Sequence, residues 1–358
     1  MKKNILMIAG PTAIPEKALA AMNRQIIFHR SREFEKISQE LTENLKKVFK
    51  TKNDVMVLTG SGTSAMEAAI ENCFSAGDEV VVVVLGVFSA RMADMAEAFG
   101  LKVTRVVKEY GEVATAKEVM QYVTENTKGV FVIHNESATG VTSDLKSFGE
   151  ALKDTGALLV VDTVSGIGAI EFEMDAWHID VAFASSQKAL MGAPGTAVIC
   201  LSDKAWKATE SATLPRFYLD LAKAREFGKK GQQPWTPAIY SFIGLNESVK
   251  MIVEEGIDQV VARNTRLSQM VVEGLGKLGI HLFAKDSSYA SKSVNTFAYD
   301  KAPLFVEKLK EEYGIEIYNG QADLHDTTFR VGTMGYVAET DVAAFLYAAG
   351  KVVEELER

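Results

Sequence analysis

Short apolar runs alternate with stretches of helical periodicity from residue 55 to residue 201. Most of the apolar runs contain almost no polar residues, which is typical of strands that are buried on both faces of a parallel sheet. The stretches between them place apolar residues every three or four positions, as amphipathic helices do. The predicted strands are 55–58, 80–85, 102–107, 129–133, 158–161, 181–184 and 196–201. The predicted helices are 16–22, 33–49, 65–73, 86–99, 117–125 and 143–154.

The pattern changes after residue 201. Charged, helical sequence without a clear motif runs from 202 to 233, and two long helices are predicted at 240–255 and 257–278. After them come strands at 280–283, 294–299 and 328–331, with helices at 303–313 and 341–356. We therefore expect an α/β fold, with an extended segment at 1–15, a large domain at 16–254 with a mostly parallel sheet, and a smaller α+β domain at 255–358.

A glycine-rich turn joins the first predicted strand to a helix: Gly60, Ser61, Gly62 and Thr63 precede the helical run at 65–73. Backbone N–H groups and the positive end of the helix dipole meet at such a turn and favour an anion. An ordinary helix N-cap explains the same residues. A dinucleotide-binding loop is a weaker interpretation, because Met66 stands where its third glycine is expected.

One lysine stands at the end of a buried strand. Lys188 follows the run 181–184 and precedes a turn marked by Gly192, Pro194 and Gly195. Burial lowers the pKa of a lysine ammonium, and the neutral amine attacks aldehydes. A surface lysine in a loop is the alternative.

Other polar clusters also follow predicted strands, namely the loop 134–140 and Asp162. In parallel α/β sheets ligands lie at the carboxyl ends of the strands, so these clusters and Lys188 are expected to share one site. Asp162 also fits a helix N-cap.

Composition and charge favour small-molecule chemistry. The net charge is −8 without any block of basic residues, so neither nucleic acid nor an anionic membrane is an expected partner. Cys73 and Cys200 show no pairing pattern, which suits a reducing compartment, and no metal site is expected. Lys2 and Lys3 resemble the start of a signal peptide, but the apolar run after them is too short and Pro11 follows. We expect a soluble cytoplasmic protein.

Four motifs in order resemble one family. They are Gly60 to Thr63, the loop HNESATG at 134–140, Asp162, and SSQKAL at 185–190. This series resembles the class V aminotransferases of pyridoxal phosphate fold type I, in particular the alanine–glyoxylate and serine–pyruvate branch. The resemblance runs from Gly10 to Gly332. It implies a seven-stranded sheet in the large domain and pyridoxal 5′-phosphate as the cofactor.

The resemblance also implies roles for single residues. Lys188 matches the lysine that forms a Schiff base with the cofactor aldehyde and moves a proton during the reaction. Asp162 matches the carboxylate that pairs with the pyridine nitrogen. Phe88 matches the aromatic over the pyridine ring, although a core phenylalanine is the alternative, and Ser137 matches a donor near the phenolic oxygen. The residues that match phosphate ligands are Ser61, Gly62, Thr63 and Gln187.

Further residues concern the substrate and a second subunit. Arg330 matches the arginine that grips the amino acid's α-carboxylate, while an exposed arginine in an ion pair is the alternative. Thr236 matches a threonine that reaches the phosphate in the other subunit, which implies a homodimer with shared active sites. Gln233 stands where the animal members of the family have a tyrosine that touches the phosphate. His29 and Arg30 resemble a segment at the mouth of the site, with no assigned role.

The resemblance implies an aminotransferase with a ping-pong cycle. The expected donor is a small amino acid, alanine or serine first, and the expected acceptor is glyoxylate or pyruvate. Aminoethylphosphonate, ureidoglycine, phosphoserine and aspartate are alternative donors, and Arg30 or Arg91 is a candidate to bind a second anion. A lyase or cysteine desulfurase is a second hypothesis, but neither Cys73 nor Cys200 lies in the C-terminal part where the catalytic cysteine is expected.

Overall fold

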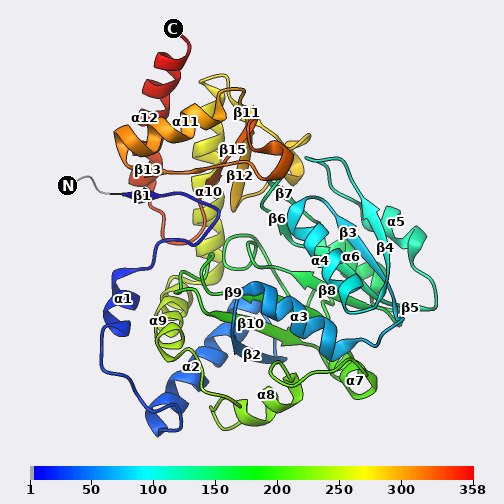
Figure 1. Cartoon of the computed structure of the whole chain (residues 1–358). Coiled ribbons are helices and arrows are strands. Elements are labelled where there is room, and N and C mark those ends of the chain that lie inside the picture. Colours follow the sequence, from blue (N-terminus) through cyan, green and yellow to red (C-terminus); the bar gives the residue numbers. More distant parts are fainter. Residues whose placement is uncertain (1–3) are drawn as a thin grey trace.

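The large sheet of the protein has seven strands, as seen in a computed structural model that describes residues 4–358. Lys2 and Lys3, weighed above as the start of a signal peptide, lie outside the described residues. The strands follow the order β2-β10-β9-β8-β5-β3-β4 across the sheet (Figure 1). Their bounds are β2 Asp54–Thr59, β3 Glu79–Val84, β4 Lys102–Val107, β5 Thr127–Ile133, β8 Leu158–Asp162, β9 Val181–Ser185 and β10 Thr196–Leu201.

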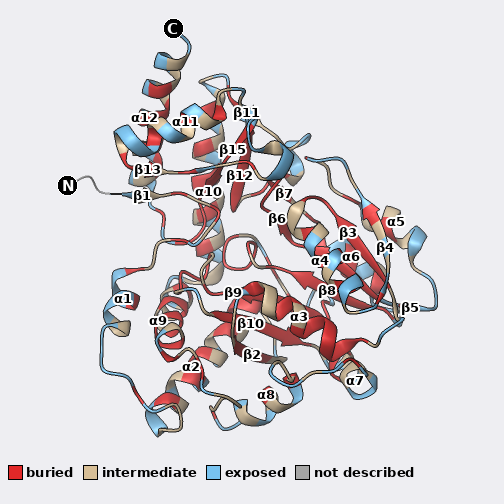
Figure 2. Cartoon of the chain, viewed as in Figure 1, coloured by how far each residue is buried: buried red, intermediate tan, exposed pale blue. Residues whose placement is uncertain are grey.

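The predicted sheet is confirmed as mostly parallel. Strands β9, β8, β5, β3 and β4 pair in parallel, whereas β10 is antiparallel to both of its neighbours, β9 and β2. The short connection through Lys188 explains the exception, because a parallel return needs a crossover of a dozen or more residues. All five residues of β9 and all six of β10 are buried, which matches their continuous apolar sequence (Figure 2).

Helices cover both faces of this sheet. Alternate side chains of one strand point to opposite faces, so Val57 packs in one apolar cluster while Met56 and Leu58 pack in the other. The first cluster draws on α2 (Arg32–Phe49), α6 (Leu145–Leu152) and α9 (Ile239–Glu255). The second draws on α3 (Gly62–Cys73), α4 (Val87–Ala98), α7 (Asp203–Ser211) and α8 (Leu221–Gly228). Helix α1 (Glu16–Met22) packs on α9.

A smaller sheet of four strands, in the order β11-β12-β15-β14, lies above the large one in Figure 1. Its strands are β11 His281–Leu282, β12 Val294–Ala298, β14 Tyr318–Asn319 and β15 Thr328–Gly332. The small sheet has a separate apolar cluster, to which α10 (Ile257–Gly276), α11 (Ala302–Lys308) and α12 (Glu339–Leu356) contribute. A π-helical turn at Leu309–Tyr313 follows α11. A separate pair joins β1 (Ile5–Leu6) to β13 (Ile315–Glu316) in parallel, so the N-terminal segment lies beside the C-terminal sheet.

One predicted helix is shorter than expected. The interval 117–125 contains α5 (Ala116–Val119) and a 3₁₀ turn at Met120–Tyr122. The chain then turns, since Thr124 N–H donates to the Thr127 hydroxyl over 2.9 Å and Asn126 N–H donates to the Thr124 hydroxyl over 3.2 Å. Threonine hydroxyls that bond the backbone in this way compete with helix formation. Among residues 4–358, no helix is long and apolar enough to cross a membrane.

Candidate active site

A cavity of about 180 Å³ lies at the carboxyl ends of the parallel strands. It brings together residues from α3, α4, the loop after β5, the end of β8 and the turn between β9 and β10. Eight residues predicted to bind the cofactor line it: Ser61, Gly62, Thr63, Phe88, Ser137, Asp162, Gln187 and Lys188. The polar residues that follow the predicted strands therefore lie together around one cavity, as the sequence predicted.

Lys188 is held against the N-terminal segment of the chain. Its Nζ donates to the carbonyl oxygen of Ala9, and its own carbonyl accepts from the Thr12 hydroxyl over 2.7 Å. A Cβ added at Gly10 would lie 2.5 Å from the lysine Cδ, so only glycine fits there. Burial lowers the pKa of Lys188 to about 8, with further lowering from the charge of Arg330. A sizeable neutral fraction near neutral pH makes this amine a nucleophile.

Asp162 is the last residue of β8 and is 5 % exposed. One of its oxygens, Oδ1, accepts from Val164 N–H over 2.8 Å, and Oδ2 accepts no hydrogen bond from the described residues. Burial raises the pKa of Asp162 to about 7, and the negative charge of Glu136 raises it further. A cation placed beside this carboxylate would lower its pKa again, and a protonated ring nitrogen is such a cation.

The N-terminus of α3 forms the wall where an anion fits. The N-cap Ser61 makes no side-chain cap hydrogen bond, and Ser64 N–H donates to the Ser61 carbonyl over 2.9 Å. The N–H groups of Gly62 and Thr63, which line the cavity, therefore remain available to an anion. Gly62 is required by close packing, since an added Cβ would lie 2.9 Å from Val164 Cγ2. Ser185 Oγ lines the same cavity, is fully buried and has no hydrogen-bond partner among the described residues.

Phe88 is positioned by a buried carboxylate. Glu136, with no exposed surface, accepts from Ser89 N–H over 2.9 Å and from the Ser89 hydroxyl over 2.8 Å. It also accepts from Ala138 N–H over 3.2 Å. Burial raises the pKa of Glu136, while these donors oppose that rise. Glu136 has no role predicted from the sequence, although it belongs to the loop 134–140 and directly precedes the predicted site residue Ser137.

His134 supports the end of β8. Its backbone N–H donates to Asp162 O over 2.8 Å, and its Nδ1 lies 2.9 Å from the Thr163 hydroxyl. Burial lowers the pKa of His134 to about 3, so the ring is neutral at physiological pH. The residue fixes the strand that carries Asp162 without lining the cavity.

Arg330 lies next to Ser137 on the side of the small sheet. It is 4 % exposed on β15, and its guanidinium donates to Asn319 O over 3.1 Å and to Ser137 O over 3.4 Å. The remaining guanidinium hydrogens form no hydrogen bond within residues 4–358, and a carboxylate accepts such a fork well. The alternative of an exposed surface ion pair does not hold, because the side chain is buried.

Thr236 and Gln233 lie outside this cavity. Thr236 is exposed on the segment between α8 and α9, and Gln233 lines a neighbouring depression with it. Arg30 holds this segment by donating to the carbonyl oxygens of Gln233 over 2.7 Å and Pro234 over 3.2 Å. Contact of Thr236 with a cofactor in a second subunit stays a prediction.

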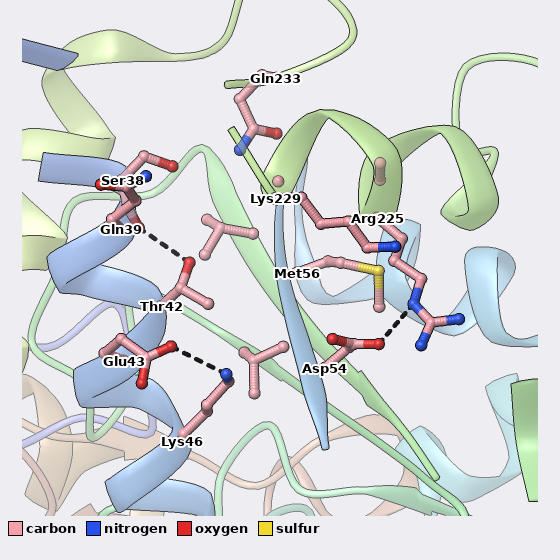
Figure 3. Close-up of a pocket in the computed structure, with 14 residues that line it drawn as sticks. Ser38, Gln39, Thr42, Glu43, Lys46, Asp54, Met56, Arg225, Lys229 and Gln233 are labelled. Atoms are coloured by element: carbon pink, nitrogen blue, oxygen red, sulfur yellow. Dashed lines mark hydrogen bonds and ion pairs between the residues drawn. The ribbon is translucent and has the colours of Figure 1, made fainter. Parts of the chain in front are cut away.

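A larger groove, of about 450 Å³, lies over the edge strand β2 between α2 and α8 (Figure 3). Its charged residues pair with each other, since Asp54 bonds Arg225 and Glu43 bonds Lys46. None of the predicted catalytic residues lines it, and Gln233 is the one predicted position that reaches its rim. Size alone is therefore a poor guide to the reactive site in this protein.

The residues around the smaller cavity fit pyridoxal 5′-phosphate. A reactive amine, a buried carboxylate and a helix N-terminus match its aldehyde, ring nitrogen and phosphate. Fold and site together define a pyridoxal-phosphate-dependent aminotransferase of fold type I. The model of the aminotransferase class-V family matches residues 6–345, and the chain belongs to this family.

Several relatives named as aminotransferases support this assignment. The chain is 37% identical to an uncharacterised aminotransferase of Methanocaldococcus jannaschii, over 99% of this chain and 94% of the relative. It is 34% identical to an L-aspartate–glyoxylate aminotransferase of Paracoccus denitrificans, over 99% and 92%. The crystal structure of an alanine–glyoxylate aminotransferase from Nostoc sp. matches with a TM-score of 0.93 and 28% identity, covering 99% of this chain and 96% of that one.

Proposed function

We propose that this aminotransferase moves the amino group of a small amino acid, alanine or serine first, to glyoxylate or pyruvate in a ping-pong cycle. The observation that carries the proposal is the meeting of Lys188 with Asp162 and the α3 N-terminus around one cavity. Arg330 supplies a buried guanidinium beside that cavity, which suits the α-carboxylate that all such donors carry. Similarity to enzymes named for glyoxylate supports the acceptor.

In this proposal pyridoxal 5′-phosphate, when bound, withdraws electrons from the carbon that carries the amino group. Lys188 would hold the cofactor aldehyde covalently through Nζ and, once free, would carry a proton to and from the substrate's α-carbon. Asp162 would keep a proton on the ring nitrogen. The residues that would bind the phosphate are Ser61, Gly62, Thr63 and Gln187, while Phe88 would contact the ring and Ser137 the phenolic oxygen.

We also propose a homodimer in which Thr236 contributes to the partner's phosphate site. Exposure of Thr236 beside Trp235 on a segment held by Arg30 supports this assignment. The exposed aromatic residues Phe217 and Tyr218 surround the same segment and would be covered by a second copy. An active species with the mass of a monomer, measured by light scattering, would contradict shared sites. A cytoplasmic location is part of the proposal, supported by two free, buried cysteines.

The first experiment is a visible absorption spectrum of the purified protein, followed by amino donors and then oxo acids. We expect the absorption band of the bound cofactor to be bleached by alanine or serine and to return with glyoxylate or pyruvate. Lys188→Ala should abolish covalent retention of the cofactor. A Lys188→Ala protein with full turnover would end the proposal.

The desulfurase alternative finds no support in the structure. Cys73 ends α3 and Cys200 lies in β10, both buried and neither lining the cavity. Burial raises the pKa of the Cys73 thiol to about 12 and raises that of Cys200 as well, which suppresses the thiolate that such chemistry needs. A cofactor absorption band that no amino donor bleaches would instead favour the lyase hypothesis.

A further inference from the structure

Arg91 stands apart from the other arginines of the described chain. The side chains of nine of the eleven arginines in the sequence form hydrogen bonds or ion pairs within residues 4–358, whereas those of Arg32 and Arg91 form neither with the described residues. Arg32 lies at the start of α2, away from the cavity. Arg91 is partly open to solvent and lines the cavity itself. A guanidinium that lines a ligand cavity without a hydrogen-bonded or ion-paired acceptor is available to an anion.

The position of Arg91 is fixed by the aromatic wall. It lies one helical turn after Phe88 on α4, and its guanidinium carbon is 5.0 Å from the centre of the Phe88 ring. Stacking on a ring restrains a flexible side chain while its N–H edge stays free for an acceptor. Arg91 is therefore held over the same ring that the cofactor is proposed to face.

Arg91 acts on the reactive groups through its charge. Burial is the main cause of the lowered pKa of Lys188, and the charges of Arg330 and Arg91 lower it further. Arg91 also opposes the raised pKa of Asp162, which burial causes. Both effects agree with a location beside the reacting groups.

The other arginine considered for a second anion is already engaged. Arg30 donates to the Gln232 side chain over 3.1 Å and to two backbone carbonyls. Its guanidinium carbon also packs 5.2 Å from the centre of the Phe227 ring. Arg30 thus holds a loop, whereas Arg91 keeps its donors.

We propose that Arg91 binds the second acidic group of an amino or oxo acid whose α-carboxylate is held by Arg330. The inference rests on the proposed aminotransferase function and names a class of substrate, the dicarboxylic acids of which L-aspartate is the smallest common amino donor. Ser137 connects the two groups, because it lines the cavity with Arg91 and accepts from Arg330 through its carbonyl oxygen. The cofactor phosphate is a poorer ligand for Arg91, because the α3 N-terminus already provides its site.

The kinetic test compares L-aspartate with L-alanine at one fixed acceptor. The ratio of their kcat/KM values cancels any change in cofactor chemistry that the two donors share. In Arg91→Gln we expect this ratio to fall about tenfold to a hundredfold, the loss that one charge-assisted contact explains. Arg91→Lys should recover part of it. Arg32→Gln, the matched change at the other arginine that forms no hydrogen bond or ion pair with the described residues, should leave the ratio unchanged.

A binding test needs no turnover. Succinate and propionate, added to the enzyme loaded with cofactor, are titrated by the change in visible absorbance. The parent enzyme should bind succinate about tenfold or more tightly than propionate, and Arg91→Gln should remove this preference.

Three results would overturn the inference. Parent enzyme that uses alanine or serine but shows neither aspartate turnover nor a preference for succinate has no second anion subsite. An equal loss for both donors in Arg91→Gln would give Arg91 a general role. A raised dissociation constant for pyridoxal phosphate with an unchanged donor ratio would assign Arg91 to the phosphate. Failure of the proposed function looks different, since no donor of either class would then bleach the cofactor band.

Discussion

Glu136 accepts hydrogen bonds from both the backbone and the side chain of Ser89, over 2.9 and 2.8 Å. The Ser89 hydroxyl in turn accepts from Leu85 N–H over 2.8 Å and Gly86 N–H over 3.0 Å. Gly86 has no room for a side chain, because an added Cβ would lie 2.8 Å from the Glu136 carboxyl carbon. One buried carboxylate thus joins the start of α4, which carries Phe88, to the loop that carries Ser137.

We predict that Glu136→Gln loosens the cofactor. An amide places a donor where backbone N–H groups now point, so Phe88 and Ser137 lose their fixed positions. The dissociation constant of pyridoxal phosphate should rise about tenfold, equivalent to about 1.4 kcal/mol, and the circular dichroism of the bound cofactor should weaken. Both are measured by titration of the protein freed of cofactor.

Asp180→Asn is the matched control for that change. Asp180 is a buried carboxylate that accepts from Leu159 N–H over 2.9 Å. It immediately precedes β9, so it lies at the amino ends of the parallel strands, and the cavity lies at their carboxyl ends. Both variants should lose about 1–3 kcal/mol in the free energy of unfolding. If Asp180→Asn also weakened the cofactor's circular dichroism, global stability and not positioning would explain Glu136.

Gly10→Ala should disable Lys188. The added methyl group would lie 2.5 Å from Lys188 Cδ, at a backbone φ of +97° that disfavours alanine. We expect the rate of turnover to fall at least tenfold, measured as the rate at which one amino donor converts the bound cofactor. Gly77→Ala is the control, since Gly77 has a φ of +87° and nothing within 4 Å of an added Cβ. It should cost only the backbone strain of about 1–2 kcal/mol.

Cofactor uptake should depend on pH through Lys188. Its pKa is lowered to about 8. Below that pH the fraction of neutral amine rises about tenfold per pH unit, and above it the fraction levels off. The rate at which protein freed of cofactor binds pyridoxal phosphate should follow the same curve in stopped-flow absorbance. A rate that still rises from pH 9 to pH 10 would mean an amine with an ordinary, unshifted pKa.

Arg330→Lys should raise the KM of every amino donor about tenfold or more. A lysine ammonium is a point charge that replaces only part of a guanidinium fork, while the cofactor contacts remain. Arg266→Lys is the control, because Arg266 is exposed and pairs with Glu339 on the surface. Unchanged donor KM values in Arg330→Lys would contradict the carboxylate assignment.

The sequence predicts the parts of this protein that local pattern controls. Continuous apolar runs identified the strands, and polar residues such as Asp162 at their ends identified the edge that carries the cavity. Contacts between segments that are distant in the chain cannot be predicted from local pattern. Nothing in the pattern near Gly10 indicates that it packs on Lys188, and nothing near Glu136 indicates that its carboxylate caps α4. The role of Arg30 likewise became clear only from its bonds to Gln233 and Pro234.

The pairing of β1 with β13 has a consequence for the synthesis of the chain. Ile5 pairs with Ile315, and the residues that follow β1 hold the lysine through Ala9 and Thr12. Residues 5–12 are therefore fixed in place only after residues 315–316, far along the chain, have been synthesised. A chain that stops before β13 can build the large sheet but lacks this support for its reactive amine. Synthesis of β13 is, in this fold, a precondition for a fully supported Lys188.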